Sequence, residues 1–173
     1  PFWPINDTGL KVVSHYYNQN MKLHKGNLNA VVFGKKLEAK HKEAIVWYVE
    51  KGVPSECQDK AWQTCSCLGT WHYNRSAYED NWYKSAETVI HMLVDIVSKN
   101  GNLLLSVPMK GNGTIDDKEE KILEDIAAWM EVNGEGIFDT RPWCIYGEGP
   151  STETAIPLDG AGFNEGKNAP YTS

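Results

Sequence analysis

The chain alternates between short apolar runs and amphipathic stretches, which is the pattern expected of strands followed by helices. Three apolar runs lie at Asn29–Phe33, Ala44–Val49 and Asn102–Val107. They are followed by Gly34, by Glu50-Lys51-Gly52 and by Pro108, in that order. Short runs without polar alternation are typical of strands buried on both faces of a parallel sheet. The order of these elements predicts βα units in an α/β protein.

Three stretches have the periodicity of helices. Asp7–His24 carries apolar residues at helical spacing, and Ser85–Asn100 has a single apolar stripe with a serine cap. A third helix is expected behind the capping-box pattern Asp117–Glu120 and ends at Asn133–Gly134. Lys35–Glu43 is rich in charge and fits either a helix or a loop. The third helix is expected to bury Ile122, Leu123, Ile126, Ala127, Trp129 and Met130.

Between the second and third apolar runs lies Pro54–Arg75, which has no helical period and is rich in Trp, Cys, Gly and Thr. We expect this segment to be a long aromatic loop. Long loops inside compact domains more often form functional sites than linkers.

Length and composition limit the function classes. The chain has 173 residues, about one domain. Its net charge of −6 argues against a nucleic-acid-binding face, and no apolar run has the length of a transmembrane helix. The sequence contains no glycine-rich nucleotide-binding motif, GxSxG or HExxH, which disfavours NTPases, dinucleotide enzymes and serine hydrolases.

The four cysteines are too few for a disulfide scaffold in a chain of this length. Cys57, Cys65, Cys67 and His72 can be drawn as a zinc site, but they lack the C-x2-C spacing of structural zinc. Free buried thiols, or one disulfide, are the favoured interpretation.

Active sites of parallel βα proteins form at the carboxyl ends of the strands, which directs attention to Glu50. It follows a buried run, stands next to Trp47 and Tyr48, and precedes the aromatic segment. An apolar wall adapts a carboxyl group to general acid catalysis. The alternative is a solvated carboxylate paired with Lys51 or another base.

The aromatic segment offers groups suited to a sugar, since the apolar face of a sugar ring stacks on an indole while its hydroxyls need polar partners. The alternative is that the tryptophans belong to the core and His72 is an ordinary loop residue. The groups concerned are Trp62, Gln63, Trp71, His72, Tyr73, Asn74 and Arg75.

Several motifs in one order carry a family resemblance. They are Trp62–Tyr73, Leu93–Pro108, Gly111–Ile115, Trp129–Ile137 and Thr140–Trp143. Together they resemble the α-L-fucosidases of glycoside hydrolase family 29.

The resemblance implies that residues 1–145 form the C-terminal portion of a (β/α)8-like catalytic barrel, incomplete in this chain. Residues 146–173 are then an irregular tail or linker. Members of the family remove terminal α-linked L-fucose with retention, which requires two carboxyl groups about 5–5.5 Å apart. The family nucleophile, an Asp, is expected immediately before Pro1, with the N-terminal half of the barrel also missing from this chain.

The same resemblance implies that Glu50, followed by Lys51–Gly52, is the general acid/base. Trp62, Trp71, His72 and Arg75 are implied sugar contacts. Two departures stand out. Gln63 replaces the glutamate of a Trp-Glu pair found in mammalian-type members, and Val32–Gly34 lacks the arginine found there in many relatives.

The implied partner is a fucosylated oligosaccharide or glycoconjugate. No cofactor, metal, nucleic acid or membrane is expected. A non-catalytic carbohydrate-binding homologue is the main alternative, and a βα domain without a role in sugar binding is a weaker one. Periplasmic, secreted and lysosomal locations all stay open.

Overall fold

The structure is a computed structural model that describes residues 6–149, 158, 164 and 165. The chain start at Pro1 and most of the predicted tail, residues 146–173, lie outside the described residues. Within them, no helix is both long and apolar enough to cross a membrane.

Four parallel strands form one sheet in the order β1-β2-β3-β4. All four carboxyl ends therefore lie at one edge of the sheet, where βα proteins place their chemistry. The fold class is α/β, as predicted. The strands are β1 (Phe33–Gly34), β2 (Val46–Glu50), β3 (Trp62–Cys67) and β4 (Gly101–Ser106).

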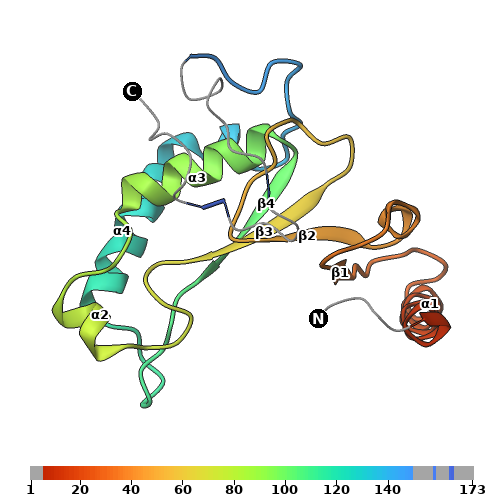
Figure 1. Cartoon of the computed structure of the whole chain (residues 1–173), viewed down its shortest axis with the longest axis horizontal. Helices are drawn as coiled ribbons and strands as arrows, with labels where there is room; N and C mark the ends of the chain where they lie inside the picture. The colour runs from red at the N-terminus through yellow and green to blue at the C-terminus, as the bar shows by residue number, and fades with distance from the viewer. Residues whose placement is uncertain (1–5, 150–157, 159–163, 166–173) are drawn as a thin grey trace.

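The helices join and cover these strands. Helix α3 connects β3 to β4, and Figure 1 shows α3 and α4 side by side, with α1 far from them beyond β1. Asn74 caps α2, Ser85 caps α3 and Asp116 caps α4, each accepting backbone N–H bonds of the first turn. The helices are α1 (Asn6–Leu23), α2 (Arg75–Glu79), α3 (Ala86–Ser98) and α4 (Asp117–Asn133), with 3-10 turns η1 (Ala39–Glu43) and η2 (Gly134–Gly136).

The register between strands defines two faces. On one face, Val49 and Trp62 pack against Ile96 of α3 and form the buried core. The opposite face carries Tyr48, Glu50 and their partners on β3 and β4, and Leu104 there is 52 % exposed. In a closed barrel the helices cover the outer face, so the face with Glu50 is the one that would turn inward.

The prediction of a loop throughout Pro54–Arg75 is wrong, because this segment contains β3 and the start of α2. The strand reads Trp-Gln-Thr-Cys-Ser-Cys and has no apolar run. Its burial comes from its central place between β2 and β4 rather than from hydrophobic side chains. Hydrophobic patterning therefore gave no signal for it.

Two other predictions need correction. The strand expected at Asn29–Phe33 is only Phe33–Gly34, at the edge of the sheet. Helix α4 begins one residue after Asp116, the actual cap, and its buried residue is Glu119. The apolar residues expected to be buried there are half-buried, and Ala127 is exposed, because α4 contacts only α3 and η2 extensively.

Candidate active site

The candidate site lies at the carboxyl edge of the sheet, where Glu50 ends β2. Its carboxylate forms an ion pair with the ammonium group of Lys35, which follows β1 directly. The two side chains are 15 % and 23 % exposed, so the pair is largely shielded from water. The carboxylate is thus anchored by the neighbouring strand, and its partner is not Lys51, the base first considered.

Tyr48 lies on the same face of the sheet as Glu50, two residues before it on β2. The Lys35 ammonium nitrogen lies 4.6 Å from the centre of the Tyr48 ring. Burial, followed by the neighbouring Cys65 thiol, raises the pKa of Tyr48 above its ordinary value, so the ring stays neutral. Trp47, the other aromatic neighbour in sequence, lies on the core face with its ring 6.3 Å from that of Trp62.

The residue after Glu50, Lys51, contacts an aromatic side chain from the loop after β3. Lys51 has a φ of 44°, in the left-handed region. Its ammonium nitrogen lies 4.8 Å from the centre of the Trp71 ring. Trp71 is 41 % exposed, so this loop presents an accessible indole near the end of β2.

The other two loop candidates are exposed and make local contacts. The Thr70 hydroxyl donates to the His72 carbonyl oxygen at 2.6 Å, which fixes the backbone and leaves the imidazole exposed. Arg75 pairs with Glu79 along α2 at 2.7 Å, and its side chain is 84 % exposed. Both residues follow the carboxyl end of β3, so they lie on the side of the sheet that carries the candidate site.

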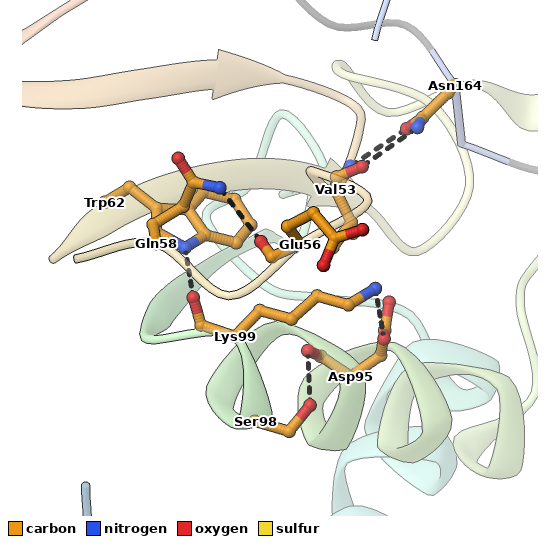
Figure 2. A network of polar contacts seen from close by, with 8 residues as sticks. All are labelled: Val53, Glu56, Gln58, Trp62, Asp95, Ser98, Lys99 and Asn164. Carbon is orange, nitrogen blue, oxygen red and sulfur yellow. Dashed lines mark hydrogen bonds and ion pairs between the residues drawn. The ribbon is translucent and has the colours of Figure 1, made fainter. Parts of the chain in front are cut away.

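The structure corrects the prediction that Trp62 contacts the sugar. Trp62 begins β3 at the amino edge of the sheet and is 1 % exposed. Its indole N–H donates to the Lys99 carbonyl oxygen at 2.9 Å, as Figure 2 shows. A residue enclosed in this way belongs to the core, which was the alternative interpretation for the tryptophans.

A second group of titratable side chains lies at the start of α4. Glu119 is fully buried, and neither of its carboxylate oxygens has a hydrogen-bond partner among the described residues. Burial, reinforced by the charge of Asp116, raises the pKa of Glu119 to about 7. The Tyr83 hydroxyl donates to Asp116 at 2.6 Å, and burial with this bond raises the pKa of Tyr83. The capping-box pattern in the sequence indicates only the start of a helix, so it gives no signal for this cluster.

All four cysteines are free; Cys65 and Cys67 are buried in β3, and Cys57 and Cys144 are exposed. The disulfide alternative therefore does not hold in this structure. Across residues 6–149, 158, 164 and 165, no three His, Cys, Asp or Glu side chains are arranged to hold a metal ion.

These features define an α/β protein with an anchored carboxylate and an exposed indole at the carboxyl edge of a parallel sheet. The family described as Alpha-L-fucosidase matches residues 6–135, so the chain belongs to the α-L-fucosidase family.

Individual relatives agree with this assignment. Human plasma alpha-L-fucosidase is 33 % identical over 92 residues, which cover 52 % of this chain and 20 % of that protein. The solved α-L-fucosidase of Vibrio sp. strain EJY3 is 25 % identical with a TM-score of 0.60, covering 76 % of this chain and 23 % of the other. Another solved alpha-L-fucosidase is 26 % identical with a TM-score of 0.65, covering 83 % and 31 %. The chain therefore spans between a fifth and a third of the length of these relatives.

Proposed function

We propose that this chain is the part of a retaining α-L-fucosidase that supplies the general acid/base, Glu50. The observation that carries the proposal is the position of Glu50, which ends an interior strand on the face opposite the helices. Family membership adds the substrate class, a glycan with terminal α-linked L-fucose. The catalytic nucleophile is proposed to lie outside this chain, before Pro1.

In the proposed mechanism, Glu50 donates a proton to the glycosidic oxygen as the bond to the anomeric carbon breaks. A nucleophilic carboxylate attacks that carbon and forms a covalent fucosyl intermediate. Glu50, now ionised, removes a proton from the incoming water, which displaces the nucleophile. The second inversion restores the original configuration.

Lys35 has a defined place in this cycle. It pairs with Glu50 in its ionised form, which is the form that removes a proton from water. When Glu50 carries the proton to be donated, the charge attraction is lost and only a hydrogen bond can remain. Lys35 therefore holds the carboxylate at the strand end.

The loop after β3 supplies the proposed sugar contacts. Trp71 offers an accessible indole on which the apolar face of fucose can stack. His72 and Arg75 are proposed to bind sugar hydroxyls or the adjoining glycan, because both are exposed on this side of the sheet. Their N–H donors match the hydroxyl and ring oxygens of a sugar.

The test is hydrolysis by the complete protein that contains this chain, comparing wild type with Glu50→Gln. A natural fucosylated oligosaccharide and an activated aryl α-L-fucoside serve as substrates. Loss of the general acid lowers kcat/KM for the natural substrate by about 10²–10⁴-fold and spares the activated substrate, whose leaving group needs little protonation. Glu43→Gln is the matched control, since Glu43 is 73 % exposed beside Lys60 and away from the carboxyl edge.

An unchanged kcat/KM in a folded Glu50→Gln variant would remove Glu50 from the mechanism. An inert wild type that still binds fucose, measured by calorimetry, would favour the carbohydrate-binding alternative instead.

A further inference from the structure

The backbone that follows Glu50 is held by residues from a distant part of the chain. The side-chain amide of Asn164 accepts from the Val53 N–H and donates to the Val53 carbonyl, both at 2.9 Å (Figure 2). The Glu165 N–H donates to the Lys51 carbonyl oxygen at 2.9 Å. Val53 and Asn164 are 111 residues apart in the sequence.

Asn164 fits this loop closely. It is 2 % exposed and lies against Gly52, where an added Cβ would come within 2.6 Å of the Asn164 side-chain oxygen. The Gly52 N–H donates to the Thr64 hydroxyl at 3.3 Å, and the Lys51 N–H donates to the Cys65 carbonyl oxygen at 3.2 Å. The loop is therefore bonded to β3 on one side and to Asn164 and Glu165 on the other.

The same segment also reaches the end of β3. Glu165 forms an ion pair with Lys84 at 2.9 Å, with both side chains about one-fifth exposed or less. The Lys84 ammonium donates to the Cys67 carbonyl oxygen at 2.7 Å. Glu50 pairs with Cys65 in the register of β2 and β3, so the segment links the carboxyl ends of both strands beside the candidate acid/base.

We infer that Asn164 is a positioning residue for Glu50, an inference that rests on the proposed acid/base role of Glu50. A general acid must lie within hydrogen-bond reach of the glycosidic oxygen, and a displacement of about 1 Å can cost about 10²-fold in rate. The left-handed Lys51 lies directly between Glu50 and the anchored loop. Release of Val53 lets this turn relax and moves the end of β2.

The chemistry of the contact requires an amide. The two bonds to Val53 need one acceptor and one donor on the same side chain, which asparagine supplies. An aspartate of the same size accepts from the N–H but meets the Val53 carbonyl oxygen with a second acceptor. Asn164→Asp is therefore expected to behave like Asn164→Ala, although its volume is preserved.

The experiment uses the complete protein and measures kcat/KM for two α-L-fucosides, one with a poor leaving group and one with an activated aryl leaving group. Asn164→Ala and Asn164→Asp are expected to lower kcat/KM about 10–100-fold on the poor leaving group. On the activated substrate they are expected to stay within about threefold of wild type. Gly52→Ala displaces the same amide from the other side and is expected to give the same pattern.

Asp95→Asn is the control for a purely structural effect. Asp95 pairs with the buried Lys99 at 2.8 Å at the amino edge of the sheet, so its loss weakens the fold but leaves the bonds of Gly52 and Val53 in place. Asp95→Asn is expected to change kcat/KM for both substrates by the same factor. Equal losses on both substrates in all folded Asn164 and Gly52 variants would overturn the inference.

The Glu50→Gln variant in the same series separates the two proposals. If Glu50→Gln shows the leaving-group dependence and the Asn164 variants do not, only the positioning role fails. If Glu50→Gln shows no dependence on the leaving group, the proposed acid/base role of Glu50 fails, and the positioning role of Asn164 fails with it.

Discussion

The amino and carboxyl edges of the sheet are formed by the same strands but differ in how their side chains are packed and exposed. At the amino edge, side chains and backbone are closely packed, and polar groups such as the Trp62 N–H and the Lys99 ammonium are bonded. At the carboxyl edge, Glu50 and Lys35 form a partly shielded ion pair, and an exposed indole stands nearby. The comparison teaches that one edge of the sheet stabilises the fold, while the other holds accessible charged and aromatic side chains where βα proteins place their sites.

The amino edge shows how closely the first kind of packing fits. An added Cβ on Gly101 would lie 2.5 Å from the Trp62 ring, so this glycine leaves the space that the indole occupies over β4. The Asn100 side chain donates to the Gln58 carbonyl oxygen at 2.9 Å and secures the chain entering β3. Figure 2 shows Gln58 near this edge and the bond from the Trp62 indole to the Lys99 carbonyl oxygen.

The largest expected effect is on stability at the amino edge. Trp62→Ala removes a fully buried indole and should lower the free energy of unfolding by about 3–5 kcal/mol. Trp82→Ala is the matched control, because Trp82 is 55 % exposed and should change stability by less than about 0.5 kcal/mol. Urea denaturation of the complete protein measures both. A small loss for Trp62→Ala would contradict its place in the core.

The second-largest expected change in stability concerns the contact between Gly101 on β4 and Trp62 on β3. Gly101→Ala should cost about 1–3 kcal/mol, because the new methyl group overlaps the Trp62 ring. Gly111→Ala has no atom within 4 Å of its new Cβ and should be close to neutral. Thermal denaturation of the two variants in parallel checks this, and equal melting temperatures would refute it.

A third prediction concerns the dependence of stability on pH. The folded state raises the pKa of Glu119 from 4.5 to about 7, so it retains a proton that the unfolded chain releases. Stability should therefore fall as the pH rises from about 4.5 to 7 and then level off, with a total loss on the order of 3 kcal/mol. Asp116, Tyr83 and Lys110 are the titratable groups that act on it.

Glu119→Gln keeps the shape of the side chain and removes the titration, so this part of the pH dependence should vanish. Urea denaturation of both proteins at pH 5 and pH 8 measures it. An identical pH dependence in the two would show that Glu119 titrates normally.

The smallest expected effect concerns Trp71 at the carboxyl edge. Its substitution should change substrate binding rather than stability, whereas Trp62→Ala should change stability. Trp71→Ala should change the free energy of unfolding by less than about 0.5 kcal/mol, because this indole is 41 % exposed. Loss of stacking worth about 1 kcal/mol should raise KM for a fucosylated substrate about fivefold. Steady-state kinetics decide it, and an unchanged KM would leave the sugar contact to other residues.

The sequence predicted the α/β class and Glu50 as the candidate, because apolar runs mark buried strands and βα proteins place sites after them. It did not predict β3, whose buried positions include Thr64, Cys65 and Ser66. Such residues give no hydrophobic signal, and only pairing with two neighbouring strands buries them.

The environment of Glu50 lay outside sequence reasoning for a different reason. Lys35, which pairs with Glu50, lies 15 residues before it in the sequence. Asn164 binds Val53 in the loop after Glu50 and lies 111 residues beyond Val53. Which lysine pairs with Glu50 depends on the alignment of β1 with β2, and no local pattern encodes that choice. The separation of Trp62 from Trp71 likewise depends on which end of β3 each one occupies.

The most direct test of the account is azide rescue of Glu50→Ala in the complete protein, with an activated aryl α-L-fucoside. The proposed mechanism predicts that a fucosyl intermediate still forms in this variant and that azide replaces the water that Glu50 would activate. Two successive inversions predict faster turnover with azide and α-L-fucosyl azide as the product, identified by NMR. A β-L-fucosyl azide product would identify Glu50 as the nucleophile, and wild-type turnover without any azide effect would remove it from the mechanism.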